Sequence, residues 1–263
     1  MAAPSDARSL AVFCDFENIA LGVREAKYAN FDMEKVLERL LAKGSIVVKK
    51  AYCDWDRYKE FKVAMHGASF ELIEIPHVRQ SGKNSADIRM VVDALDLCYT
   101  KEHVDTFVIV SGDSDFSPLV SKLRENAKLV IGVGVKNSSS DLLINNCDEF
   151  IYYDDLVRAD EQKRRAAKKR KDAAPSGDDK KDKKQEGFDL MLGTLEALIA
   201  ERGADEKIWG SMVKQALKRR HPGFNETYYG FRAFADLLKE AQQKGLIKLD
   251  PDEKSGGYIV RPT

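Results

Sequence analysis

The chain has 263 residues, of which 43% are hydrophobic and 33% are charged, and its 43 basic and 43 acidic side chains give no net charge. These values predict a globular chain of one large or two small domains with a polar surface. No segment approaches the roughly 18 consecutive apolar residues of a membrane-spanning helix. The first ten residues, MAAPSDARSL, lack the layout of a secretory signal peptide. We therefore expect a cytoplasmic protein.

The first 157 residues alternate between short apolar runs and helical patterns. Strands are expected at residues 9–16, 45–53, 69–76, 106–113, 128–135 and 149–153, and helices at residues 32–44, 56–68, 85–99, 115–127 and 138–148. Runs such as FVIV lack polar alternation, as expected of strands that are buried on both faces. This order predicts an α/β fold, a Rossmann-like, doubly wound parallel sheet with helices on both faces.

A basic connector is expected at residues 158–187. Residues 1–157 carry 19 Lys and Arg against 25 Asp and Glu, a net charge of −6, whereas residues 158–186 carry 12 against 7, a net charge of +5. This segment has almost no large apolar side chains, so we expect it to be flexible. Its core, KRRAAKKRK, either keeps the chain soluble or attracts phosphate groups, and the sequence leaves both possibilities open.

A second, smaller domain is expected at residues 188–263. Helical patterns at residues 188–203, 207–220 and 225–245 precede two short strands around PDEKSG, which is the layout of a winged helix-turn-helix. In the third helix, Phe231, Phe234, Ala235 and Leu238 form the predicted core stripe.

Acidic residues follow two of the predicted strands. Asp15 ends the first strand, and Asp113 and Asp115 follow the apolar run that begins at residue 106. In a doubly wound sheet, ligands bind at the carboxyl ends of the strands. These three carboxylates are therefore expected at one edge of the sheet.

The helix at residues 85–99 supplies a further carboxylate. Its predicted core stripe is Ile88, Val91, Val92 and Leu95, with Ser85 as the N-cap. Asp87 then lies in the first turn, beside the strand ends, because the crossover is right-handed. Asp93 lies six residues further along, about 9 Å down the axis. We therefore rank Asp87 above Asp93 as a site residue.

Four carboxylates from three segments call for a counter-ion, because unit charges 4 Å apart repel by about 4 kcal/mol at an effective dielectric of 20. Mg²⁺ or Mn²⁺ prefers such oxygen ligands and supports displacement at phosphorus. The alternative for each aspartate alone is a helix or turn cap, as for Asp115 before FSPLV. The set as a whole favours the metal site at Asp15, Asp87, Asp113 and Asp115.

Other acidic and cofactor sites fit less well. A haloacid-dehalogenase-type phosphatase needs Asp-x-Asp after the first strand, where this chain has Asp15 and Glu17. A Toprim-type site needs a Glu after the first strand, and this chain has Asp15 there, although Asp113 and Asp115 match its later Asp-x-Asp. The segment IGVGVKN lacks the third glycine of a dinucleotide fingerprint. The four cysteines form no CxxC pair and the four histidines show no metal-ligand spacing, so buried, reduced cysteines are expected.

Four ordered motifs, VFCDFENI, GKNSADIRMVVDAL, VIVSGDSDFSPLV and LLINNCDEFIYYDDL, resemble the NYN domains, the LabA-like branch of the PIN-like ribonuclease superfamily. The resemblance covers about residues 9–155. It implies that Asp15, Asp87, Asp113 and Asp115 bind the metal, that Asn18 supports the site, and that Asp93 is a second-rank acidic position. The tail, about residues 188–260, resembles the OST-HTH (LOTUS) domain, a family associated with RNA and, in some members, with protein partners.

Residues and resemblance together predict a metal-dependent ribonuclease with a tethered RNA-binding module. Arg79 and Lys83 are candidates for steering phosphate, with ordinary solvation of an exposed loop as the alternative. In the tail, charge combines with stackable rings, as unpaired RNA requires; the candidates are Lys214, Lys218, Arg219, Arg220, Tyr228, Tyr229 and Arg232. At least one of the two tyrosines is expected to pack inside.

Two rival functions remain open at this point. A PIN-like domain could bind RNA or a protein without cutting it. Alternatively, a winged-helix regulator would place MVKQALKRRHPGF near the DNA major groove, although its basic side chains are sparse for that task.

Overall fold

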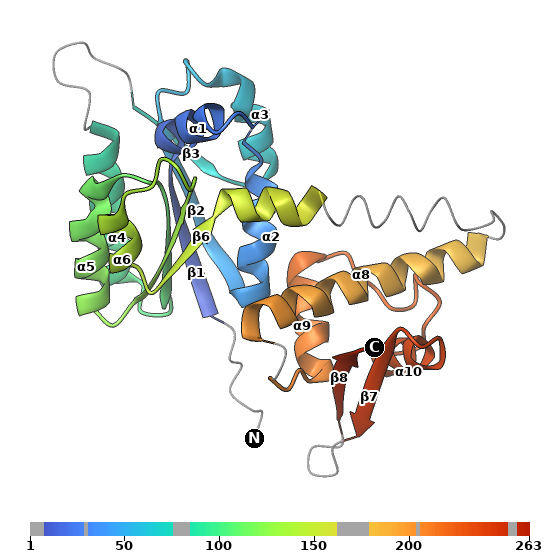
Figure 1. The fold of residues 1–263 in the computed structure, drawn as a ribbon. Helices are drawn as coiled ribbons and strands as arrows, with labels where there is room; N and C mark the ends of the chain where they lie inside the picture. Colours follow the sequence, from blue (N-terminus) through green and yellow to red (C-terminus); the bar gives the residue numbers. More distant parts are fainter. Residues whose placement is uncertain (1–7, 29–30, 76–84, 162–178, 204–205, 252–256) are drawn as a thin grey trace. The chain divides into compact units, whose positions relative to one another are not determined.

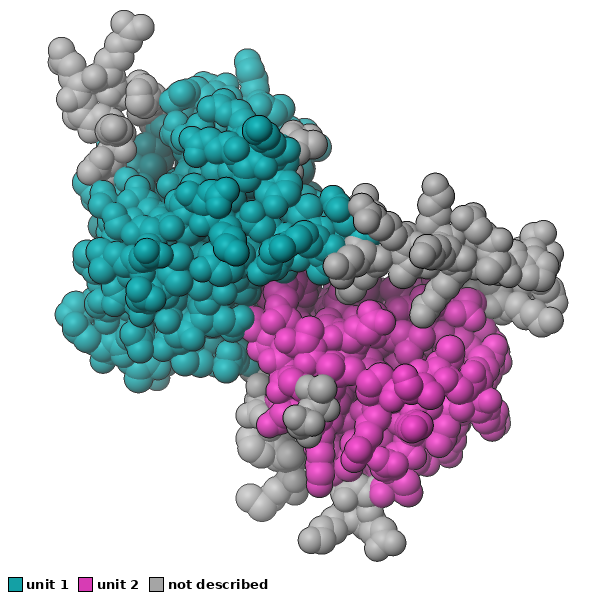
Figure 2. Space-filling view, viewed as in Figure 1, with its two compact units in different colours: residues 1–37, 45–167 teal, residues 38–44, 168–263 magenta. Residues whose placement is uncertain are grey.

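The computed structural model describes residues 8–28, 31–75, 85–161, 179–203, 206–251 and 257–263. The chain divides into two compact units, residues 1–37 with 45–167 and residues 38–44 with 168–263 (Figure 2). Arg79 and Lys83, and the basic segment KRRAAKKRK, lie outside the described residues.

The first unit is built on a six-stranded parallel sheet with the order β3-β2-β1-β4-β5-β6 (Figure 1). All six strands fall where they were predicted: β1 (Arg8–Asp15), β2 (Gly44–Cys53), β3 (Glu71–Glu74), β4 (Thr106–Val110), β5 (Leu129–Gly134) and β6 (Glu149–Tyr152). The chain runs outward in both directions from the β1–β4 pair, where Cys14 lies opposite Val110. This pair is the topological switch point at which doubly wound sheets bind ligands.

Helices cover both faces of this sheet. The elements are α1 (Phe16–Glu25), α2 (Met33–Lys43), α3 (Lys59–Gly67), α4 (Ser85–Thr100), the 3₁₀ turn η1 (Ser114–Phe116), α5 (Ser117–Glu125) and α6 (Asp141–Asn146). In Figure 1, α4, α5 and α6 lie on one face, and α1 and α2 lie on the other. α1 was not among the predicted helices, although Phe16, Ile19 and Val23 give it a buried stripe. A helix at residues 153–161 was not predicted either.

The core beneath α4 and α5 corrects the predicted orientation of α4. Phe13 and Phe107 stack with ring centroids 6.0 Å apart, and α4 covers them with Met90, Ala94 and Cys98. Ile88 and Val92 of the predicted stripe are exposed, whereas Val91 and Leu95 are only partly buried. The helix is apolar on more than one face, so periodicity alone selected the wrong one.

The second unit contains α8 (Asp179–Arg202), α9 (Gly210–Arg220) and α10 (Phe234–Gln243), followed by the antiparallel strands β7 (Ile247–Pro251) and β8 (Tyr258–Pro262). Its core includes Phe188, Leu217, Leu237 and Val260. The order of three helices and a hairpin is as predicted, but α8 begins nine residues before the predicted start at residue 188.

The third helix of this unit is shorter than predicted. It begins at Phe234, because Gly230 has a φ of +81°, a left-handed conformation that interrupts a helix. Phe231 is still buried, but it lies before the helix, and Ala235 is exposed. Leu237 and Ala241 complete the buried face instead. None of the described helices is both long and apolar enough to cross a membrane.

Candidate active site at the carboxyl edge of the sheet

Asp15 lies at the switch point, where its side chain is fixed by two hydrogen bonds. It ends β1 and caps α1, accepting a hydrogen bond from the backbone N–H of Asn18 at 3.3 Å. The hydroxyl of Ser111, which follows the neighbouring strand β4, donates to Asp15 Oδ2 at 3.0 Å. Asp15 is buried, so its carboxylate has a single defined position rather than a solvated range of positions.

The loop after β4 is held close to α1. Asn18 Oδ1 accepts a hydrogen bond from the Gly112 N–H at 2.8 Å. A Cβ at Gly112 would lie 2.5 Å from the backbone oxygen of Ser138, a distance that real Cβ atoms do not reach. Only glycine therefore allows this close approach. The structure thus places Asn18, predicted as a supporting residue, between the two acidic segments.

Asp113 follows Gly112 and precedes the 3₁₀ turn η1, which contains Asp115. The Asp113 side chain accepts a hydrogen bond from the Asp115 N–H at 3.0 Å and so caps η1. The Asp113 N–H donates to Ser111 Oγ at 3.1 Å, so Ser111 links Asp113 to Asp15. Asp115 is exposed. Asp113 can cap η1 and still bind a further ligand, because a carboxylate has several acceptor positions.

The first turn of α4 brings Asp87 to the same edge, as predicted from helix geometry. The pKa of Asp87 is raised from its usual 3.8 to about 6. Burial is the main cause, and the negative charges of Asp113, Asp115 and Glu17 add to it. Burial likewise raises the pKa of Asp15 to about 7, with Asp87 as the next cause. Hydrogen bonds from Asn18 and Ser111 oppose this rise. Carboxylates that disfavour each other's ionisation lie near one another.

Asp93, the second-rank position, faces a different part of the molecule. Its carboxylate accepts a hydrogen bond from Tyr52 Oη of β2 at 2.9 Å and pairs with Arg89 at 3.0 Å. Lys50 Nζ lies 3.6 Å from it. These contacts fasten the middle of α4 to the sheet.

Two residues near the site were not predicted from the sequence. Ser111 joins Asp15 to the β4 loop, and its only sequence signal is a hydroxyl between a buried strand and Gly112. Glu17 contributes negative charge to Asp87 and pairs with Arg57 at 3.2 Å. No group of three or more His, Cys, Asp or Glu among the described residues is arranged closely enough to enclose a metal ion.

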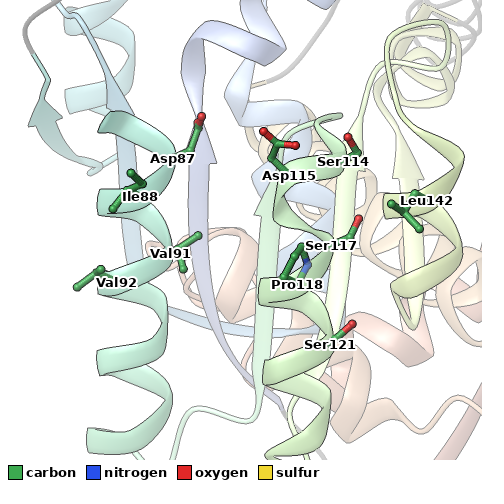
Figure 3. Close-up of a pocket in the computed structure, with 10 residues that line it drawn as sticks. All are labelled: Asp87, Ile88, Val91, Val92, Ser114, Asp115, Ser117, Pro118, Ser121 and Leu142. Atoms are coloured by element: carbon green, nitrogen blue, oxygen red, sulfur yellow. The ribbon is translucent and has the colours of Figure 1, made fainter. Parts of the chain in front are cut away.

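A groove opens directly beside the acidic residues (Figure 3). It has a volume of about 690 Å³ and reaches from α4, across η1 and α5, to α6. Asp87 and Asp115 lie at one end of it, as Figure 3 shows. The remaining lining is apolar or hydroxylic: Ile88, Val91, Val92, Ser114, Ser117, Pro118, Ser121 and Leu142.

The structure places the predicted tail residues in different environments. Tyr228, Lys218 and Arg232 are exposed, and Lys183 Nζ lies 4.9 Å from the centroid of the Tyr228 ring. As expected of one of the pair, Tyr229 packs inward and stacks on Phe224 with centroids 5.1 Å apart.

The remaining basic candidates are less free. Lys214 pairs with Glu226 at 2.9 Å, Arg219 is half-buried, and Arg220 donates to the Gly193 carbonyl of α8 at 3.0 Å. Within the tail, Tyr228, Lys218 and Arg232 are therefore the candidates most accessible to a ligand.

The doubly wound sheet and the acidic switch point define an α/β protein with a PIN-like fold. Residues 9–154 match the family model of the NYN domain, which is more than half of the chain. The chain therefore belongs to the NYN domain family.

Similar proteins fit this assignment. An uncharacterized protein of Methanocaldococcus jannaschii is 30% identical over 125 residues, covering 48% of this chain and 49% of that protein. Meiosis regulator and mRNA stability factor 1 of Xenopus tropicalis is 26% identical over 148 residues, covering 56% of this chain and 9% of that protein. The chain thus spans half or less of these relatives. The crystal structure of a protein of unknown function from Vibrio parahaemolyticus superposes with a TM-score of 0.52 at 28% identity, covering 59% of this chain and 98% of that one.

Proposed function

We propose that the NYN domain is a metal-dependent ribonuclease that hydrolyses RNA phosphodiester bonds within the strand. The observation that carries this proposal is the convergence of acidic side chains at the switch point of the sheet: Ser111 links Asp15 to Asp113, and burial first and neighbouring carboxylates second raise the pKa of Asp15 and Asp87. Such an arrangement is costly without a cation, and functional sites are where carboxyl pKa values are raised in this way. Membership of the NYN family and the printed name of the Xenopus relative support a role in RNA metabolism.

The carboxylates suit Mg²⁺ or Mn²⁺, with Asp15, Asp87, Asp113 and Asp115 as ligands. Mg²⁺ keeps several waters and is usually held by one or two carboxylates, so an open crevice suits it better than a closed cage. An ion bound there would lower the pKa of a water and offset charge on the phosphate. Ser111 and Asn18 fix the direction of Asp15, and the Asp115 N–H fixes that of Asp113.

The C-terminal unit would bind RNA as an OST-HTH (LOTUS) winged-helix module, tethered by the basic segment. The exposed Tyr228 ring offers a stacking surface, with Lys183 beside it and Arg232 nearby in sequence. Base stacking of this kind suits unpaired or structured RNA and is worth about 1–3 kcal/mol per base. We place this activity in the cytoplasm, in keeping with the four free cysteines.

The decisive experiment compares the full chain with Asp113→Asn on labelled single-stranded and structured RNA, in Mn²⁺, Mg²⁺ or EDTA. The parent should cut in the presence of a metal, and the variant should lose cleavage while keeping its fold, as read by circular dichroism. RNA binding without cleavage by the parent in any of the metals would instead support a non-catalytic adaptor. Tighter binding to duplex DNA than to any RNA at equal salt would support a DNA-binding regulator.

A further inference from the structure

Some of the exposed apolar side chains of the first unit lie together beside the acidic residues. Eight large apolar or aromatic side chains are exposed in the described part of the chain, and three of them line the groove between α4 and α6. These are Ile88, Leu142 and Val92, which are 63%, 59% and 56% exposed. Exposed apolar side chains that gather in one place usually mark a binding site. The unused face of α4 is therefore a candidate binding surface.

The groove has the dimensions of a site for one small ligand. Its volume of about 690 Å³ lies within the range of roughly 300–1,000 Å³ that ligand pockets occupy. A stable protein partner would need about 800 Å² on each side, an area much larger than such a groove provides. The groove therefore suits one nucleotide better than it suits a protein surface.

The charges that line the groove indicate which part of a nucleotide could bind there. None of the described residues that line it is Lys or Arg, and Asp87 and Asp115 close one end. A phosphate on the apolar part of the groove would lose its hydration with no basic side chain to replace it, and at the acidic end it needs a metal ion between it and the carboxylates. An uncharged base and its ribose would bury apolar surface against Ile88 and Val92, with the attached phosphate at the acidic end.

A buried hydroxyl in the groove lacks a partner. Ser117 is 5% exposed and lines the groove, and its Oγ makes no hydrogen bond to any described residue. An unsatisfied buried hydroxyl is unfavourable, and a ligand that supplies a donor or acceptor relieves this cost. Ser114 of η1 and Ser121 of α5 carry hydroxyls on the same side as Ser117 in Figure 3. This side of the groove offers hydrogen bonds, whereas the α4 side offers apolar contact.

From these observations, and building on the proposed ribonuclease activity, we propose that the groove is a specificity subsite for the base of the nucleotide adjacent to the cleaved phosphate. The base packs against Ile88, Val92 and Leu142, and its polar edge or the ribose hydroxyl bonds to Ser117 once that side chain turns toward the groove, because its Oγ is enclosed in the unliganded structure. The identity of this base then affects binding, because the hydroxyl can satisfy some base edges better than others.

The test uses the full chain with Val92→Asn and Ser117→Ala. The control is Val63→Asn, which changes an 82%-exposed valine on α3 that does not line the groove. Binding of a fluorescent single-stranded RNA is measured by anisotropy in Mn²⁺ with Asp113→Asn added to every variant, so that no cleavage occurs, and kcat and KM are measured in Mn²⁺ without that change. Val92→Asn should raise Kd and KM about tenfold with kcat within twofold, a change that corresponds to about 1.4 kcal/mol.

Ser117→Ala should flatten the preference for the base beside the cut, read by sequencing the products from a randomised RNA. If both groove variants bind and cut as Val63→Asn does, the subsite proposal is wrong while the nuclease stands. If the parent binds RNA and Val92→Asn weakens that binding, but neither cuts, the subsite stands and the proposed cleavage fails. A Val92→Asn change that alters only the sedimentation of the protein would mean that a second copy occupies the groove, which overturns the subsite.

Discussion

Replacing Asp15 by Asn should change how the stability of the metal-free first unit depends on pH. In the folded protein, burial and the charge of Asp87 raise the pKa of Asp15 from 3.8 to about 7. The folded state therefore holds this proton more tightly than the unfolded state does. The resulting stabilisation is complete below pH 3.8 and is lost as the pH rises through 7. A difference of about three pKa units corresponds to about 4 kcal/mol at 1.36 kcal/mol per unit.

Asn cannot ionise, so Asp15→Asn should lack this loss of stability. The amide still accepts from the Asn18 N–H, but the Ser111 hydroxyl loses its acceptor, which costs about 1 kcal/mol at every pH. The variant should therefore be slightly less stable than the parent at pH 4 and about 3 kcal/mol more stable at pH 8.5.

The assay is urea unfolding in EDTA at several pH values, followed by tryptophan fluorescence. The chain has two tryptophans, and a shared Trp209→Phe change leaves the buried Trp55 as the reporter of the first unit. Equal slopes of stability against pH in the parent and in Asp15→Asn would refute the assignment of the buried proton to this carboxyl. If the free energies of unfolding of the two proteins differed by the same amount at every pH, the difference would report only the lost hydrogen bond to Ser111.

Three further predictions test other parts of the structure. Asp87→Ala should abolish most Mn²⁺ binding by calorimetry, whereas Asp93→Ala should bind Mn²⁺ nearly as well as the parent; the reverse order would mean that the wrong carboxylate is assigned to the site. Gly112→Ala should lower the free energy of unfolding by about 1–3 kcal/mol, because its Cβ would meet the Ser138 carbonyl; an unchanged melting temperature would contradict this. Tyr228→Ala should weaken binding to single-stranded RNA by about 1–3 kcal/mol in filter-binding assays, and unaltered affinity would exclude the ring as a stacking surface.

The sheet could be predicted because its strands are short, uninterrupted apolar runs that turns separate. The same reasoning placed Asp15 and Asp113 at one edge, since the carboxyl ends of parallel strands meet there. The burial of α4 could not be predicted in the same way. Its apolar residues suit two faces, and the contact between Tyr52 and Asp93 helps to select the one that carries Met90.

The parts of the site that were not predicted depend on contacts between distant segments. Ser111 and Asp15 are 96 residues apart, and no local pattern indicates that the hydroxyl of one lies beside the carboxylate of the other. Glu17 follows Asp15 closely, but its influence on Asp87 depends on the path of α4. The predicted third helix of the tail failed for a local reason, since the positive φ of Gly230 ends any helix that would cross it.

The hydrogen bond between Tyr52 and Asp93 has a consequence for the position of Asp87. Asp87 lies about 1.7 turns before this contact on the same helix, so its distance from Asp93 along the helix axis is fixed. Met90 and Ala94, which are buried residues of the same helix, fix its rotation about its axis. Contacts that follow Asp87 in the chain therefore hold its carboxylate at the edge of the sheet.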